Sequence, residues 1–145
     1  MSAIAVRGID HVVLRIADLE RSLYFYRDVL GCPEERRLPE LGLVQLRAGS
    51  GLIDLVLVDS PLGKLGGDPP GGKGRNLDHF ALQLESLDPQ AVRAQLEAAG
   101  VEPGDVAERY GAEGMGLSMY LRDPDGNTVE LKGPGAIRPR IKKGP

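Results

Sequence analysis

The chain consists of two similar halves, and this internal repeat constrains its fold more than any other feature. The first half opens with GIDHVVLRIADLERSLYFYRDVLG and the second with NLDHFALQLESLDPQAVRAQLEAAG. In both, an apolar residue, an aspartate and a histidine precede an alternating apolar segment, a polar link, an amphipathic segment and a glycine. The halves also end alike, in LIDL and TVEL. We therefore expect two copies of one structural unit.

The first half has the signals of a strand followed by a helix. Residues 9–16 alternate as a strand does. Asp18 is a favourable helix N-cap, and Gly31 supplies a left-handed stop. Between them, apolar residues recur at helical spacing, namely Leu19, Leu23, Tyr26 and Leu30. The second half repeats the pattern, because Asp88 and Pro89 open a helix that Gly100 ends.

Each half continues with three short strand candidates. They are expected near residues 34–38, 43–47 and 52–58, and again near 105–109, 117–122 and 127–132. Asp123-Pro124-Asp125-Gly126 is a strong turn signal, so the last two strands should form a hairpin.

The predicted fold class is therefore α+β, with two tandem βαβββ modules that form a cup-shaped mixed sheet with the helices outside. The modules cover residues 8–60 and 77–133. A glycine-rich linker at 61–76 joins them, and a basic tail occupies 134–145. With 145 residues, the chain is expected to be one domain. Residues 109–116 are interpreted as a mobile loop over the cup or as a plain surface turn.

Strand alternation places four titratable side chains on the face turned away from the helices: His11, Asp54, His79 and Glu130. The histidines are the only two in the chain and occupy the same position of the repeat. A carboxylate ends each module. Imidazole and carboxylate together suit Fe, Mn, Co, Ni or Zn. The sequence thus predicts one divalent metal ion, in a site that leaves positions for substrate or water.

The same alternation identifies further candidates. Ser118, Tyr120 and Arg122 share one face of their strand, and Gln45 and Arg47 occupy the related face of the first half. Tyr120 would donate a hydrogen bond to a metal-bound oxygen. Arg122 would hold an anionic substrate group or pair with an acid near the turn.

Composition excludes several classes of protein. The net charge is −3 and the charges are scattered, which argues against a nucleic-acid surface. No apolar run is long enough to span a bilayer, and the N-terminus lacks the apolar stretch of a signal peptide. The single cysteine, Cys32, permits no intrachain disulfide and is interpreted as a structural thiol. We expect a cytoplasmic protein.

The segments IDHVVLRIADLERSLYFYRDVLG and LRDPDGNTVEL resemble the opening and closing motifs of the glyoxalase/bleomycin-resistance/extradiol-dioxygenase superfamily, also called vicinal oxygen chelate. The resemblance covers about residues 8 to 133. It implies paired modules around a metal held by His11, His79 and Glu130. Asp54 matches a fourth position, where glyoxalase I has Glu and methylmalonyl-CoA epimerase has Gln. Because Asp is shorter, the alternatives for Asp54 are ligation through water, service as a base, or neither.

The resemblance suggests a glyoxalase I-like lyase or isomerase acting on a small oxygen-chelating substrate. The metal would bind two adjacent substrate oxygens and stabilise an enediolate, while Glu130 or Asp54 moves the proton. Tyr120 is the third catalytic candidate. A small-molecule substrate and a homodimer are the partners that the resemblance implies.

Three alternatives stay open. One is an Fe(II) extradiol-type dioxygenase that uses His11, His79 and Glu130 alone. Another is a fosfomycin-type thiol transferase, because SMYLRDPDGNTVEL resembles the end of those enzymes. The last is a metal-free binding module of the bleomycin-resistance kind.

Overall fold

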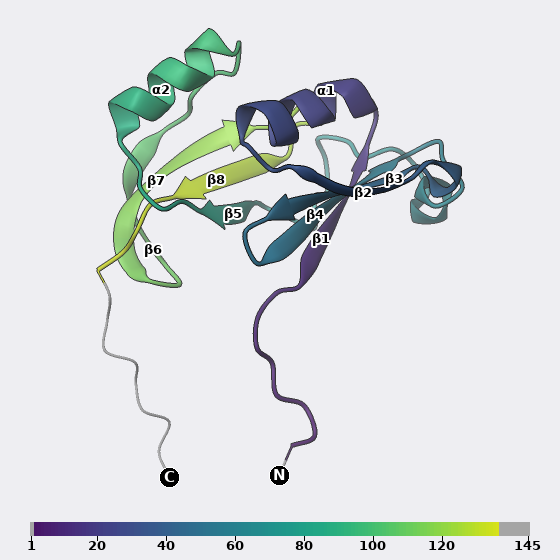
Figure 1. Cartoon of the computed structure of the whole chain (residues 1–145), viewed down its shortest axis with the longest axis horizontal. Coiled ribbons are helices and arrows are strands. Elements are labelled where there is room, and N and C mark those ends of the chain that lie inside the picture. The colour runs from purple at the N-terminus through teal and green to yellow at the C-terminus, as the bar shows by residue number, and fades with distance from the viewer. Residues whose placement is uncertain (1, 137–145) are drawn as a thin grey trace. The chain divides into compact units, whose positions relative to one another are not determined.

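The computed structural model describes residues 2–136. These residues divide between Arg75 and Asn76 into two compact units, 2–75 and 76–136. We call these units module 1 and module 2. Each contains one four-stranded sheet, with strand order β1-β4-β3-β2 in module 1 and β5-β8-β7-β6 in module 2 (Figure 1). The two sheets share one topology. The predicted α+β fold of two tandem βαβββ modules is confirmed.

The elements of module 1 are β1 (His11–Ile16), α1 (Leu19–Leu23), η1 (Tyr24–Val29), β2 (Glu34–Leu38), η2 (Pro39–Leu41), β3 (Leu43–Ala48), β4 (Gly51–Leu57) and η3 (Gly63–Gly66). Those of module 2 are β5 (Phe80–Gln83), α2 (Pro89–Ala98), β6 (Val106–Gly111), β7 (Gly114–Arg122) and β8 (Thr128–Lys132). In each sheet the first strand pairs in parallel with the last, and the other neighbours are antiparallel.

The helix caps are those that the sequence predicts. The carboxylate of Asp18 accepts a hydrogen bond from a backbone N–H of the first turn of α1, and that of Asp88 does the same for α2. These bonds satisfy donors that have no partner inside a helix. Gly31 and Gly100 follow the two helices with φ of 80° and 76°, the left-handed conformation that glycine adopts without strain.

The first helix differs from the prediction in its second half. After α1 the chain continues in wider π-helical turns, η1, where the Leu30 N–H donates to the Phe25 carbonyl at 2.9 Å. The wider turn changes which residues point inward. Phe25 and Val29 are buried, whereas Leu30, which regular helical spacing placed in the core, is only half-buried.

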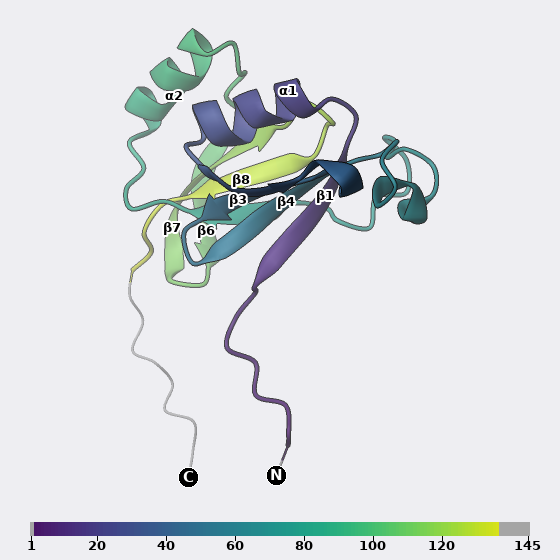
Figure 2. The ribbon, with the colours of Figure 1, turned by 45° about the vertical axis from the view of Figure 1, so that its right-hand side comes forward.

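The core of each module lies between the helix and one face of its sheet, as Figure 2 shows for α1. In module 1 this core includes Leu14, Ile16, Leu23, Tyr26, Leu46, Ile53 and Leu55. In module 2 it includes Leu96, Met119, Leu121, Val129 and Leu131. Because strand side chains alternate, the residues between these positions lie on the opposite face of each sheet. We call that opposite face the site face.

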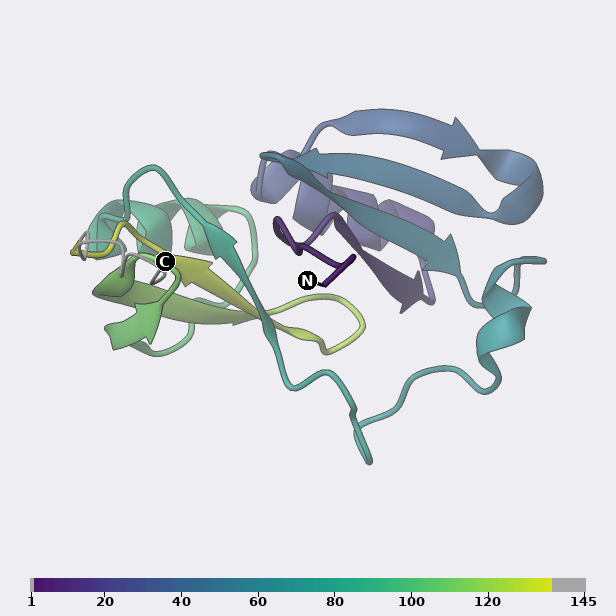
Figure 3. The same ribbon diagram turned by 90° about the horizontal axis from the view of Figure 1, so that it is seen from below.

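The linker is attached to the site face of module 1 at its start. Figure 3 shows the segment between β4 and β5 as a long loop with one short helical turn, η3. The guanidinium of Arg15 donates to four backbone carbonyls of this segment, those of Gly63, Gly66, Gly67 and Asp68. A side chain at Gly66 would overlap the Arg15 guanidinium, so the close approach requires glycine there.

Residues 109–116, interpreted as a mobile loop or a plain surface turn, form a β-hairpin with a two-residue turn at 112–113. This segment continues β6 and begins β7, with Arg109 paired to Gly116 and Gly111 to Gly114. Gly111 and Gly114 flank the tight turn that joins the two strands. The other predicted hairpin, β7–β8, is present, and the Asp123 carboxylate accepts backbone hydrogen bonds from Asp125 and Asn127.

Three further expectations concern Cys32, membrane-spanning helices and the basic tail. Cys32 is buried, and burial raises the pKa of its thiol, which fits a structural role. No helix among residues 2–136 is long and apolar enough to cross a membrane. Of the predicted basic tail, residues 134–136 are described, and 137–145 lie outside the described residues.

Candidate functional site

His79 and Glu130 lie close together on the site face of module 2. Glu130 is 6% exposed, and His79 directly precedes β5. The Nε2 atom of His79 lies 3.6 Å from Oε1 of Glu130. Two ligands held about 2.1 Å from one tetrahedral cation are about 3.4 Å apart. The pair therefore has the spacing of two ligands that share a metal ion.

Tyr120 contacts both of these residues. It is the cross-strand partner of Glu130, and its ring meets the His79 ring edge to face, with 5.6 Å between centroids. Burial raises the pKa of the Tyr120 phenol, and the negative charge of Glu130 raises it further, while Arg109 acts in the opposite direction. The hydrogen bond with Glu130 adds to the increase. The phenol, which is protonated at neutral pH even at its ordinary pKa of about 10, therefore keeps its proton.

Arg109 is a member of this group that sequence analysis missed. Its guanidinium carbon lies 4.2 Å from the centre of the Tyr120 ring, a cation–π contact. Its Nη1 donates to Ser118 Oγ and its Nη2 to Asp105 Oδ2, each at 2.7 Å. Strand alternation extended to Arg109 predicts that its side chain lies on the site face. The glycines that follow it favoured a loop instead.

The site face of module 1 carries His11 and Asp54. The hydrogen bond between His11 Nδ1 and the Asp10 carboxylate raises the pKa of the His11 imidazole, and the negative charge of Asp54 adds to the increase. Asp54 is 5% exposed. The Gln45 side-chain amide donates to both of its carboxylate oxygens, at 3.2 and 3.1 Å.

The two modules present histidine and carboxylate in the same register. In each module, the acidic residue of the last strand is paired in the parallel ladder with a residue of the first strand. The histidine lies two residues before that first-strand residue. The pairs are Val13 with Asp54 and Ala81 with Glu130. Positions two apart in a strand share a face, so His11 lies on the face of Asp54 and His79 on that of Glu130.

The residue that faces the carboxylate from the neighbouring antiparallel strand differs between the modules. Gln45 stands opposite Asp54, whereas Tyr120 stands opposite Glu130. The amide of Gln45 occupies both Asp54 oxygens. Glu130 is one methylene longer than Asp54 and reaches its histidine. The two carboxylates therefore lie in different environments, Asp54 beside the Gln45 amide and Glu130 beside His79.

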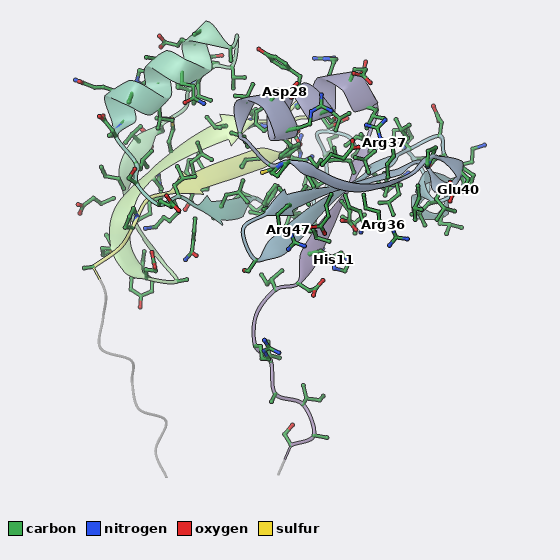
Figure 4. The ribbon with its side chains drawn as sticks, viewed as in Figure 1. His11, Asp28, Arg36, Arg37, Glu40 and Arg47 are labelled. Carbon is green, nitrogen blue, oxygen red and sulfur yellow. The ribbon has the colours of Figure 1, made fainter. Side chains whose placement is uncertain are left out.

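The structure gives partners for both arginines that the sequence placed on the site face. Arg122 donates to the Gly126 carbonyl at 3.3 Å, so it supports the β7–β8 turn through a carbonyl rather than an acid. Arg47 forms a two-pronged ion pair with Glu35, at 2.9 and 2.8 Å. Figure 4 shows Arg47, Arg36 and His11 on one side of the module 1 sheet, with Asp28 and Arg37 on the side of the helix.

The donor set suits a divalent transition metal. Within residues 2–136, His, Cys, Asp and Glu side chains form no ready group of three around a metal position. In module 2, His79 and Glu130 form a close pair, and in module 1 His11 holds the matching position of the repeat. Imidazole and carboxylate are ligands that Fe, Mn, Co, Ni and Zn accept.

Comparison with known families identifies the fold. The family described as Glyoxalase/Bleomycin resistance protein/Dioxygenase superfamily matches residues 8–131, most of the chain. The chain belongs to this superfamily. The match spans both modules of this glyoxalase-superfamily chain.

Two curated relatives illustrate how broad the superfamily is. A catechol-2,3-dioxygenase of Bacillus subtilis is 30% identical over 132 residues, which cover 91% of this chain and 42% of the dioxygenase. This chain thus spans less than half of that protein. A virulence protein of Salmonella typhimurium is 27% identical over 128 residues, which cover 85% of this chain and 81% of the relative.

Solved structures of superfamily type agree with the two-module fold. An integron cassette protein from V. cholerae is 25% identical, with a TM-score of 0.68, and the alignment covers 91% of this chain and 98% of that one. A lactoylglutathione lyase from Agrobacterium tumefaciens is 25% identical, with a TM-score of 0.61, and covers 88% of this chain and 94% of its own. The superfamily therefore contains both dioxygenases and lyases, and the side chains must discriminate between them.

Proposed function

We propose that this chain is a metal-dependent enzyme, a glyoxalase I-like lyase or isomerase that acts on a small oxygen-chelating substrate. The proposal assigns His11, His79 and Glu130 as ligands of one divalent cation. Asp54 and Tyr120 are its catalytic residues beside Glu130. The cation is Ni, Zn, Co, Mn or Fe.

One observation carries the proposal: both modules present a histidine and a buried carboxylate on the site face in one register. A buried carboxylate is costly unless it is paired or binds a cation. Glu130 lies at ligand spacing from His79, and His11 repeats the position of His79. The similarity to a lactoylglutathione lyase structure supports lyase chemistry.

A bound divalent cation would supply Lewis acidity to two adjacent substrate oxygens. Asp54 is suited to move a proton between neighbouring substrate carbons, because Gln45 orients its carboxylate. Among residues 2–136, this carboxylate forms no ion pair with a basic side chain. Tyr120 keeps its proton, so its hydroxyl serves as a donor to Glu130 or to a substrate oxygen. Its contact with His79 keeps the ring against the proposed ligands.

Metal content tests the site itself. The purified protein is expected to contain about one transition metal per chain, measured by mass spectrometry after reconstitution with each candidate ion. His79→Ala and Glu130→Gln should lose it, whereas Glu113→Gln, in the exposed β6–β7 turn, should retain it. A wild-type protein that takes up none of these ions would overturn the enzymatic proposal and favour a sequestering, metal-free module.

Activity tests the reaction. Isomerisation of hemithioacetals, followed by absorbance, should require the metal and should fall about 100-fold or more in Asp54→Asn with the metal still bound, as expected for loss of a general base. Retention of full activity in Asp54→Asn would remove Asp54 from the mechanism.

A dioxygenase is the second candidate, because the catechol-2,3-dioxygenase of Bacillus subtilis is 30% identical to this chain. Two histidines and one carboxylate also form the ligand set of non-haem Fe(II) oxygenases. In that case Asp54 would be a bystander held by Gln45. Oxygen uptake with catechols by the Fe(II)-loaded protein, unaffected by Asp54→Asn, would favour this function over the lyase.

The proposal includes a homodimer, by similarity to the superfamily. Mixing experiments test whether one chain supplies all three ligands. His11→Ala and His79→Ala each remove one ligand, and the two variants are refolded together. Recovered metal binding would mean that two chains share a site, whereas no recovery would mean that each site draws on a single chain.

A further inference from the structure

Both candidate metal-ligand histidines form the same hydrogen bond with the residue that precedes them. His11 Nδ1 lies 2.7 Å from Asp10 Oδ1, and His79 Nδ1 lies 2.7 Å from Asp78 Oδ2. Each aspartate lies just ahead of the first strand of its module. Its side chain is 91% exposed at Asp10 and 97% exposed at Asp78, so neither side chain packs in the core.

The bond decides which ring nitrogen is available to a metal. An ionised carboxylate only accepts hydrogen bonds, so the nitrogen facing it carries the proton. A neutral imidazole has one N–H, which leaves the lone pair on the other nitrogen. With the proton on Nδ1, the lone pair is on Nε2. In module 2, Nε2 of His79 is the atom that lies 3.6 Å from Glu130.

We propose that Asp10 and Asp78 are positioning residues that hold His11 and His79 as the Nδ1-protonated tautomers and present both Nε2 atoms to the cation. Carboxylates behind metal-bound imidazoles orient the ring and strengthen the ligand. The same pair occurs at the start of both modules, which a chance surface contact does not explain. The role of the two aspartates in metal binding rests on the proposed function, whereas the tautomer assignment does not.

Nitrogen NMR of the metal-free protein tests the tautomer. The chain has only two histidines, so [15N]histidine labelling gives two assignable rings. The spectra are recorded at about pH 9, well above the ordinary imidazole pKa of about 6.5. The wild-type protein should show the proton on Nδ1 of both rings. Asp10→Ala should shift His11 toward the Nε2-protonated tautomer without changing His79, and Asp78→Ala should do the reverse.

Asp59→Ala is the matched control, because it removes the same charge from an exposed position of module 1. It should leave both rings unchanged. Two results would overturn the tautomer assignment. One is a wild-type spectrum in which Nε2 carries the proton, and the other is an Asp10→Ala spectrum identical to that of the wild type.

Metal affinity tests the positioning role with a readout other than activity. In competition with a chromophoric chelator, Asp10→Ala and Asp78→Ala should each bind Co(II) or Zn(II) about 10–100-fold more weakly than the wild type. Asn at either position should restore part of the affinity, because its side-chain oxygen still accepts from Nδ1–H. Unchanged affinity in both Ala variants would overturn the positioning role. A wild-type protein without metal affinity would overturn the proposed function instead, and the NMR result would still decide the tautomers.

Discussion

The side-chain amide of Gln45 donates to both carboxylate oxygens of Asp54, at 3.2 and 3.1 Å, across two neighbouring strands of the module 1 sheet. In module 2 the same cross-strand position opposite the carboxylate is Tyr120, which faces Glu130. The repeat of this chain therefore places a hydrogen-bond donor beside each carboxylate but uses a different chemical group in each module. This difference separates a candidate ligand from a candidate base.

Gln45→Met should destabilise the metal-free protein by about 1–3 kcal/mol, because it leaves a buried carboxylate without the amide that donates to it. Urea unfolding measures the free energy. The same substitution in an Asp54→Asn background should cost less than about 1 kcal/mol, since a neutral amide loses less when its partner is removed. Equal costs in the two backgrounds would show that the hydrogen bond contributes little.

His11 should titrate above its ordinary pKa of 6.5 in the metal-free protein, because the Asp10 carboxylate favours the protonated ring and Asp54 adds to the effect. A raised folded-state pKa means that this pair stabilises the fold below the unfolded-state pKa. The contribution is lost as the pH rises through the folded-state value. A proton NMR titration of the ring measures the pKa, and Asp10→Asn should move it down. A wild-type midpoint at or below 6.5 would contradict this expectation.

Leu14 and Val13 are neighbours in β1 that lie on opposite faces. Leu14 is 5% exposed in the core, whereas Val13 is 52% exposed on the site face. Leu14→Ala should cost about 2–5 kcal/mol, through lost burial and the cavity that remains. Val13→Ala should cost less than about 1 kcal/mol. Thermal or urea unfolding of the two variants checks the assigned faces, and similar costs would mean that the alternation is misassigned.

Arg15→Gln should release the start of the linker, because the guanidinium binds four carbonyls between residues 63 and 68. A loss of about 1.4 kcal/mol of local stability would increase about tenfold the fraction of molecules in which this segment is detached. The rate of tryptic cleavage at Lys64 should increase by the same factor. Lys73, in the same linker but outside the held segment, is the internal control. Mass spectrometry of early digestion products gives both rates, and a parallel rise at Lys73 would indicate general loosening instead.

Much of the fold could be predicted because its signals are local. Asp18 and Asp88 cap the helices through backbone groups three residues away or fewer, and alternation in β1 and β8 depends only on the pleat. The repeat added long-range information, since two matched Asp-His motifs implied two matched strands. The π-helical turns of η1 and the continuation of β6 and β7 through residues 109–116 were not predicted. In both, packing and ladder pairing overrode the regular spacing and the loop-forming tendency of glycine.

The sequence by itself determined the two modules, their caps, the faces of their strands and the identity of the four titratable residues on the site face. Only the tertiary structure decided which side chains those residues contact. Sheet register joined Gln45 to Asp54 and Tyr120 to Glu130, and it brought Arg109 over the Tyr120 ring. Register is set by how whole faces bury their apolar residues, and a shift of one residue would turn each of these side chains to the other face. Local sequence patterns specify a face, but the partners on that face come from strands that fold together from distant parts of the chain.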